Sequence, residues 1–220
     1  MDSPRDTDDD FDNSSDESWI EWFCGLDGNQ YLCEVDEDFI DDEFNIYGLS
    51  SYFTYYQEAL DVIMSVAEPE SFVDKDILLI KKEAALLYGL IHARYILTSS
   101  GLKKMYAKYR KGEFGGCPRV LCDNHAVLPV GTSDIPYIGE TKLFCPKCGE
   151  EYSIPQGFVG SSLDGSYFGT TFPHLLMLNV QGIQEAQKYK PTVFGFLVRK
   201  EAAPPGVFRR TKERLCVFDV

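Results

Sequence analysis

The sequence lacks the features that direct a chain into or across a membrane. Its opening residues, MDSPRDTDDDFDNSSDES, hold no basic segment followed by an apolar run, so they do not form a secretory signal. No stretch approaches the roughly 18 consecutive apolar residues of a membrane span. We therefore expect an intracellular protein without a membrane partner, in which thiols stay reduced and disulfides are rare.

Motifs of catalysis are missing as well. The glycines of GFVGSSLDGSYFGTTFPH match neither the phosphate-binding loop nor the dinucleotide-binding pattern. The chain also lacks the Gly-rich loop and the His-Arg-Asp motif of a protein kinase. No nucleophile motif accompanies His92, which we interpret as a structural histidine of a helix. The sequence thus predicts a protein without catalytic groups of its own.

Basic residues are almost absent from the first fifth of the chain. Residues 1–43 contain 17 Asp and Glu but only Arg5, whereas residues 44–220 carry 18 acidic and 20 basic residues. Residues 1–18 have almost no apolar content, so we expect a disordered acidic tail. Three hydroxyls of this tail have an acid three residues further on and are candidate sites for an acidophilic kinase: Ser3, Thr7 and Ser14.

Aromatic residues return between residues 19 and 44 and alternate with acids. The aromatic and aliphatic side chains are numerous enough to anchor this segment on a core, and we interpret Cys24 and Cys33 as small buried hydrophobes. The acids would then form a fixed patch, either a solvated helix face or a surface that attracts polyamines or basic proteins. The patch consists of Asp36, Glu37, Asp38, Asp41, Asp42 and Glu43.

Helical patterns follow as far as Gly112. Residues 51–66 read as a helix that ends before Pro69. Apolar residues between 77 and 95 recur at steps of three and four, which predicts an amphipathic helix with Ser71 or Asp74 as its N-cap. We expect the segment 98–101 to end that helix, and a further short helix to close at Gly112. Residues 19–112 are thus predicted to form an α-helical domain.

Four of the seven cysteines form two close pairs with 22 residues between them: Cys117, Cys122, Cys145 and Cys148. Zn²⁺ prefers four ligands in a tetrahedron, and two thiolate pairs on tight turns supply them. Gly149 allows a sharp turn after the second pair. Because four thiolates leave no open position, we expect a structural zinc site. His125 could compete as a ligand, but we interpret it as a surface histidine.

The four cysteines predict a small zinc-ribbon domain, which we assign to residues 113–156 and refer to as the ribbon. The ribbon is unusually apolar for its size. Such a small module cannot bury all its apolar residues, so the remainder indicates either a partner surface, most simply a second copy, or packing against the helical domain. A transcription or nucleic-acid-associated ribbon would carry a basic face, but residues 117–152 hold three basic side chains against five acidic ones. We therefore expect no nucleic acid partner.

The C-terminal segment KPTVFGFLVRK alternates large apolar residues about a glycine, which predicts a hairpin or an exposed strand. Its aromatics belong either to a last strand of the core or to an anchor for another protein. We assign residues 157–200 to a Gly- and aromatic-rich segment with this hairpin, and residues 201–220 to a flexible tail. The predicted fold class is α+β, with a helical domain, a Cys₄ zinc ribbon and an extended hairpin tail.

Separated blocks of the chain resemble the regulatory (beta) subunits of casein kinase II. The resemblance runs from Trp19 to about Arg199, and its most specific stretches are WFCGLDGN, CEVDEDFI, LLYGLIHARYILT, FGGCPRVLC, LPVGTSDIP, LFCPKC and YFGTTFPH. Both cysteine pairs and their 22-residue gap fit the family spacing. The tail beyond Arg199 is unlike the known forms of the family, and we assign it no function.

The resemblance implies a non-catalytic subunit of a Ser/Thr protein kinase, whose zinc module, with its four cysteines as ligands, is the homodimerisation surface. Phe194 and Phe196, with Val198 beside them, occupy the aromatic anchor positions of the hairpin that docks onto the catalytic (alpha) subunit. It further implies a tetramer of two regulatory and two catalytic chains, phosphorylation near the N-terminus, and presence in cytoplasm and nucleus. The second acidic stretch of the family falls at residues 65–76, which here hold only four acids, so polyamine regulation there is in doubt.

Overall fold

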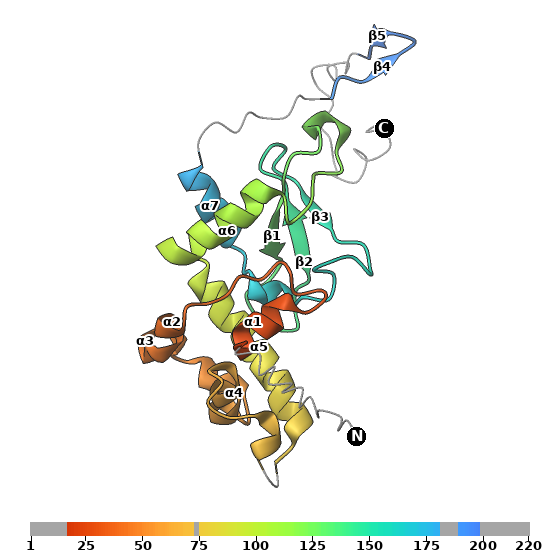
Figure 1. The fold of residues 1–220 in the computed structure, drawn as a ribbon. Coiled ribbons are helices and arrows are strands. Elements are labelled where there is room, and N and C mark those ends of the chain that lie inside the picture. The colour runs from red at the N-terminus through yellow and green to blue at the C-terminus, as the bar shows by residue number, and fades with distance from the viewer. Residues whose placement is uncertain (1–16, 73–74, 181–188, 199–220) are drawn as a thin grey trace, which may run out of the picture. The chain divides into compact units, whose positions relative to one another are not determined.

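The computed structural model describes residues 17–72, 75–180 and 189–198. Contacts divide the chain into two units, Met1–Ala186 and Gln187–Val220 (Figure 1). The helices of the first unit are α1 (Trp19–Gly25), α2 (Glu37–Asp41), α3 (Glu43–Ile46), α4 (Tyr56–Ile63), α5 (Ile77–Tyr95), α6 (Ser99–Lys111) and α7 (Phe172–Asn179), with the 3₁₀ turns η1 (Leu49–Tyr52), η2 (Pro69–Ser71), η3 (Val120–Cys122) and η4 (Gly165–Tyr167). Its strands are β1 (Leu128–Gly131), β2 (Thr141–Phe144) and β3 (Glu151–Ser153).

The second unit contributes a two-stranded hairpin, β4 (Thr192–Val193) and β5 (Phe196–Leu197). Helices α1 to α6 thus precede the two small antiparallel sheets along the chain, and α7 lies between the sheets, which confirms the predicted α+β fold class. Among the described residues, no helix is both long and apolar enough to cross a membrane.

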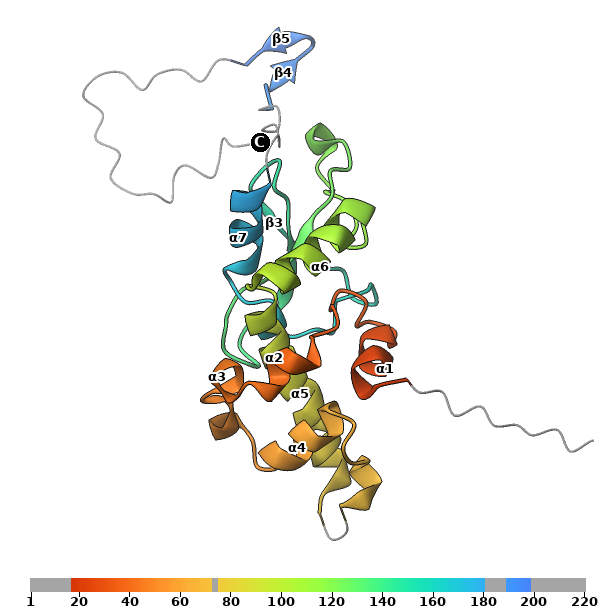
Figure 2. The same cartoon turned by 60° about the vertical axis from the view of Figure 1, so that its left-hand side comes forward.

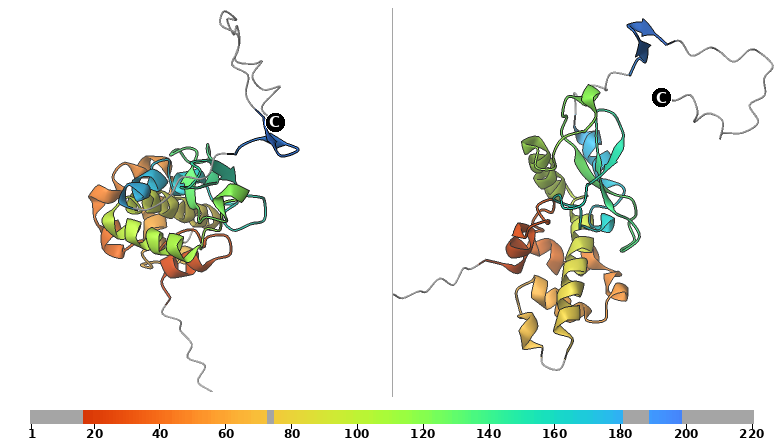
Figure 3. Two further views of the ribbon diagram at one scale, coloured as in Figure 1. Left: turned by 90° about the horizontal axis from the view of Figure 1, so that it is seen from above. Right: turned by 90° about the vertical axis from the view of Figure 1, so that its right-hand side faces the viewer.

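Helix α5 forms the middle of the first unit, with the other helices and the sheet around it (Figure 3). Its bounds match the predicted 77–95, but the cap is Asp76, whose carboxylate accepts a hydrogen bond from the Leu79 amide at 3.0 Å, and not Ser71 or Asp74. Every side chain from Leu86 to His92 is buried. The prediction of a one-sided apolar stripe is therefore wrong for this half, because a helix surrounded by packing partners is apolar on all its faces.

The predicted helix over residues 51–66 is shorter than the sequence indicated. Helix α4 begins only at Tyr56, because the backbone at residues 53–55 is non-helical. The Glu83 carboxylate on α5 accepts hydrogen bonds from the backbone amides of Thr54 at 3.0 Å and Tyr55 at 2.7 Å. The Glu83 carboxylate, which is distant in the sequence, thus accepts hydrogen bonds from two backbone amides just before the helix, where a local capping side chain would otherwise be the acceptor. Helices α4 and α5 then lie side by side.

Helix α6 begins within the segment 98–101, which was predicted only to end the preceding helix. Thr98 is its N-cap and accepts a hydrogen bond from the Gly101 amide at 3.1 Å, so the segment 98–101 separates two helices and starts the second one. The predicted end at Gly112 is confirmed, since this residue adopts a left-handed φ of 74°. Figure 2 shows α6 on the outside of the first unit.

The ribbon sheet has the order β1-β2-β3, with antiparallel pairing of Leu128 to Phe144 and of Leu143 to Tyr152. Strand β1 is buried along its whole length and contacts α7. Buried residues of the ribbon, among them Val127 and Leu128, belong to the same hydrophobic cluster as the core residues of the helices. The explanation by packing against the helical part is therefore confirmed for these residues. Other apolar residues, including Val120 and Ile138, stay exposed, and a partner surface there stays a prediction.

A buried histidine connects three segments of the first unit. A Cβ on Gly89 would lie 2.2 Å from the Tyr167 ring, so only glycine lets η4 approach α5 this closely. One turn further, His92 Nδ1 lies 2.7 Å from the Tyr167 carbonyl, and Nε2 accepts a hydrogen bond from the Cys33 amide at 3.1 Å. Burial lowers the pKa of His92 to about 4. The imidazole is a neutral structural group, as the sequence predicted.

We expect His92 to make stability pH-dependent. The unfolded chain takes up a proton below pH ~6.5, whereas the folded chain resists it down to a pKa of about 4. The stabilisation is therefore complete above pH ~6.5 and falls by up to about 3 kcal/mol as the pH drops towards 4. Denaturant unfolding of wild type and His92→Gln between these values measures the difference, in which protonation of other groups cancels. Equal pH slopes for the two chains would contradict this role.

Candidate functional site

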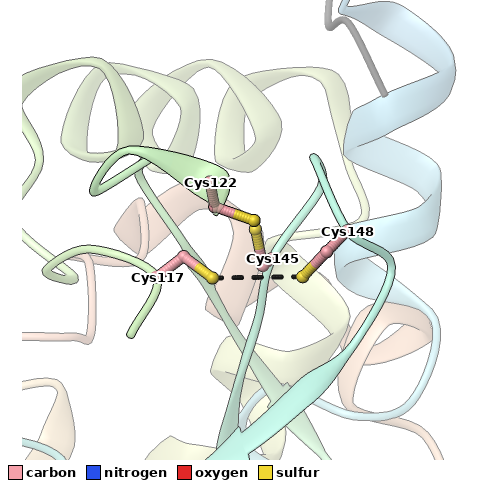
Figure 4. A group of neighbouring side chains, drawn as sticks. All are labelled: Cys117, Cys122, Cys145 and Cys148. Carbon is pink, nitrogen blue, oxygen red and sulfur yellow. Dashed lines mark hydrogen bonds between the residues drawn. The ribbon is translucent and has the colours of Figure 1, made fainter. Parts of the chain in front are cut away.

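The four paired cysteines meet at one point of the ribbon. Their sulfur atoms all lie within 4.8 Å of one another, and Cys117 Sγ is 3.9 Å from Cys148 Sγ. Figure 4 shows the four side chains pointing towards a common centre. A tetrahedral zinc ion with Zn–S bonds of about 2.3 Å places its sulfurs about 3.8 Å apart. All cysteines in the described ranges are free thiols, so the cluster can hold a metal ion.

The first turn of the site is built without glycine. The Cys117 amide donates to the His125 carbonyl at 2.8 Å, and the His125 amide to the Cys122 carbonyl at 3.2 Å, which closes the loop between the first two ligands. Asp123 and Asn124 allow this turn with left-handed φ values of 54° and 52°. Asp and Asn tolerate that conformation better than other non-glycine residues, and this was the signal available in the sequence.

The second turn has the glycine that the sequence predicted. Gly149 adopts a φ of 74°, and its amide donates to the Cys145 carbonyl at 2.8 Å. Burial raises the pKa of the Cys145 thiol to about 12. At Cys148 burial acts in the same direction but is outweighed by hydrogen bonds from the Tyr152 hydroxyl and the Glu150 backbone, which lower the pKa to about 6. Cys148 can thus bind a cation as a thiolate, whereas the buried Cys145 must release its proton when a cation binds.

Three other candidate residues lie outside the cysteine cluster: His125, Cys24 and Cys33. His125 is outside the sulfur group, and its Nε2 lies 3.2 Å from the Tyr109 hydroxyl, so it supports the turn through its backbone and ring. Cys33 is buried as predicted. Cys24 is only half-buried, and its sulfur lies 3.2 Å from the Tyr88 hydroxyl. Burial raises the pKa of both thiols, to about 11 at Cys24 and about 12 at Cys33.

The hairpin of the second unit presents aromatic side chains to solvent. Phe194 and Gly195 form its two-residue turn with φ values of 48° and 84°, the pattern of a type I′ turn. Phe194 is 97% exposed and Phe196 is 79% exposed. Val198, also exposed, donates its amide to the Pro191 carbonyl at 2.9 Å and closes the hairpin. A bulky residue in left-handed conformation costs about 1 kcal/mol, so this turn displays Phe194 despite local strain.

The six acids of the predicted patch lie on and beside two short helices. All of them are exposed, while Ile40 of α2 and Ile46 of α3 are buried beneath them. Asp36 receives hydrogen bonds from Lys104 and Tyr95, both at 2.7 Å, which lower its pKa, with Lys104 contributing most. The remaining patch residues are Glu37, Asp38, Asp41, Asp42 and Glu43. Their role in binding stays a prediction.

Two of the four acids of the second acidic stretch, residues 65–76, make internal contacts. Glu70 forms an ion pair with Lys81 at 2.6 Å, and Asp76 caps α5. The predicted phosphorylation sites Ser3, Thr7 and Ser14 lie outside the described residues, as do the predicted disordered tail up to residue 16 and the C-terminal segment 201–220.

The chain combines a helical scaffold with a Cys₄ cluster and a solvent-facing aromatic hairpin. This combination is typical of a binding or regulatory protein. Residues 18–197 match the family described as casein kinase II regulatory subunit, and the chain belongs to this family. Its members are regulatory and not catalytic subunits.

Curated relatives agree with the family match. The chain is 48% identical to casein kinase II subunit beta-3 of Arabidopsis thaliana over 84% of its own length and 68% of the relative. It is 48% identical to casein kinase II subunit beta of Schizosaccharomyces pombe, over 87% of this chain and 84% of that one. Identity to casein kinase II subunit beta' of Drosophila melanogaster is 42%, over 86% and 88%.

Proposed function

We propose that this chain is a zinc-stabilised homodimer that binds two casein kinase II catalytic subunits, stabilises them and alters their choice of substrate. The observation that carries the proposal is the solvent exposure of Phe194 and Phe196 on a hairpin that belongs to its own unit. Two highly exposed aromatics close together in the sequence are typical of an interface anchor. Calorimetric binding to a catalytic subunit tests it, as argued in the Discussion.

Zinc would join the two halves of the ribbon. Cys117 and Cys122 precede β1, whereas Cys145 and Cys148 follow β2, so one ion would connect both ends of the strand pair. Four thiolates would complete its coordination, and its contribution would be to folding energy, with no substrate position left. The Tyr152 hydroxyl and the Lys147 ammonium, which donates to the Cys122 carbonyl at 3.1 Å, would hold the ligand turns in place.

The dimer contact would lie beside this zinc site. Val120 sits between the first two ligands and is 91% exposed, which is unusual for an aliphatic side chain next to a buried cluster. A two-fold contact places this surface against its own copy, so each apolar residue is used twice. The opposite end of the β1–β2 pair carries the 132–140 loop, with the exposed Ile138.

Val120→Glu should weaken dimerisation about a hundredfold or more while zinc content stays unchanged. A symmetric interface would acquire two glutamates facing each other, and like charges together cost several kcal/mol. Sedimentation equilibrium measures the dimer constant and atomic absorption the zinc. The matched variant Ile138→Glu, at the far end of the strands, should dimerise like wild type. A larger loss in Ile138→Glu than in Val120→Glu would move the contact to the loop.

The acidic patch and the tail would serve regulation. We propose that the exposed carboxylates on α2 and α3 attract basic substrates or polyamines, and that the tail hydroxyls are phosphorylated by the associated kinase. The complex would act in cytoplasm and nucleus. The double variant Glu37→Gln/Asp38→Asn tests the role of the patch. The variant should assemble like wild type, but its complex should no longer show stimulated phosphorylation of a basic peptide substrate. Unchanged stimulation would contradict the role.

A further inference from the structure

Helix α6 concentrates positive charge on the surface of an acidic chain. Its sequence, SSGLKKMYAKYRK, contains five basic residues and no acid, whereas the chain as a whole carries a net charge of −14. Met105 and Tyr109 are buried beneath it. Lys103, Arg110 and Lys111 are exposed and recur at helical spacing, so they share one side of the helix. We refer to these three residues as the basic face.

Internal ion pairs neutralise the neighbours of the basic face and, in part, one of its three residues. Lys104 pairs with Asp36 at 2.7 Å, and Lys108 pairs with Glu113 at 2.8 Å. Lys111 lies 3.5 Å from the same Glu113, whose charge is therefore shared. Within the part of the chain that the structure describes, Lys103 and Arg110 have no acidic partner. Positive charge thus remains available on the outside of α6.

The stability of the helix explains only part of this composition. Cations in the last turn interact favourably with the helix dipole, which accounts for Lys108, Arg110 and Lys111. Lys103 lies outside that turn, where the dipole provides no gain. The clustering of these charges is better explained by an acidic binding partner than by helix formation.

We propose that the acidic N-terminal segment, residues 1–17, binds across the basic face of α6 within the same chain. This segment contains eight acidic residues and a single base, Arg5, so its charge complements the face. Covalent attachment gives it an effective concentration in the millimolar range, enough for a contact that would be weak between separate molecules. Occupied in this way, α6 would be shielded from other acidic partners.

The start of the described chain lies within reach of α6. The Trp19 ring is 5.7 Å from the ring of Tyr88, and the Tyr88 hydroxyl donates to the Cys33 carbonyl at 2.9 Å. The Lys104 ammonium in turn lies 3.0 Å from the Glu34 carbonyl. These contacts connect the beginning of α1 with α6 through neighbouring side chains. A segment of 17 residues extends up to about 55 Å, which is ample for this span.

Carbodiimide coupling of the full-length chain tests the proposal, because it joins carboxylates directly to amines that they contact. We expect mass spectrometry to find crosslinks from acids of residues 1–17 to Lys103 and Lys111. Arg110→Gln removes a charge between them without removing an amine and should reduce both crosslinks about threefold. The matched variant Lys82→Gln, an exposed lysine of α5, should leave them unchanged. Raising salt from about 50 mM to about 500 mM should also reduce them.

Each of four results would overturn the proposal. Tail crosslinks that spread over exposed lysines such as Lys82, or that persist at full yield in Arg110→Gln, would show no preference for the basic face. Crosslinks between isotopically heavy and light chains in a mixture would place the tail on a second copy. An electrophoretic shift of duplex DNA that Arg110→Gln abolishes, without tail crosslinks in wild type, would assign the face to nucleic acid.

Discussion

Cys145→Ser should leave a chain that neither retains zinc nor dimerises. Cys145 is fully buried at the end of β2, and its sulfur closes the group formed by the other three ligands. Structural zinc contributes on the order of 10 kcal/mol to the folding of small metal domains, more than a ribbon of short strands obtains from its own packing. Because the dimer contact is proposed to lie beside the ligands, losing the ion should abolish the contact.

Zinc content and sedimentation velocity measure both parts of this expectation. The matched control is Cys24→Ser, since this half-buried thiol lies outside the cluster and a serine hydroxyl can keep the contact with Tyr88. The control should bind one zinc per chain and dimerise like wild type. A Cys145→Ser chain that is free of metal yet fully dimeric would refute the link between zinc and assembly.

Phe194→Ala/Phe196→Ala should abolish tight binding to a casein kinase II catalytic subunit. Both side chains are exposed and neither belongs to the hydrophobic core, so their removal should not destabilise it. Aromatic anchors at interface centres typically contribute 2 kcal/mol or more each, and the pair should therefore weaken binding about a thousandfold. Dimerisation, zinc content and thermal unfolding should stay at wild-type values.

Isothermal titration calorimetry with a purified catalytic subunit measures the loss. Phe158→Ala provides the control, because Phe158 is also an exposed aromatic and lies outside the hairpin. It should bind as tightly as wild type. If the double variant bound with undiminished affinity, the catalytic subunit would still be the partner, but the hairpin would not be the contact. An equal loss of affinity in both variants would indicate a general effect of removing an aromatic side chain.

The cysteine cluster could be predicted from the sequence because the residues that form it lie on two short local segments. Two cysteine pairs and Gly149 lie on short turns, and the structure brings all four sulfurs together. The turn at Asp123 and Asn124 escaped prediction, although the Asp-Asn dipeptide is compatible with the left-handed conformation. The hairpin was predictable for the same reason, since Gly195 interrupts alternating apolar residues.

The helical half was harder because its boundaries depend on distant residues. Glu83 removes a turn from the start of α4 by binding the amides of Thr54 and Tyr55, about thirty residues away. Gly101 and its neighbouring serines resemble a break, yet Thr98 caps a new helix there. Packing around α5 from several sides likewise hides the one-sided pattern that an amphipathic helix would show.

Native mass spectrometry of the zinc-loaded chain mixed with a casein kinase II catalytic subunit tests the central claim most directly. The account predicts one dominant complex of two regulatory chains, two catalytic chains and two zinc ions. With Phe194→Ala/Phe196→Ala it predicts a zinc-bound dimer of the regulatory chain alone beside free catalytic subunits. A wild-type chain that contains zinc but remains unbound at micromolar concentrations of the catalytic subunit would contradict it.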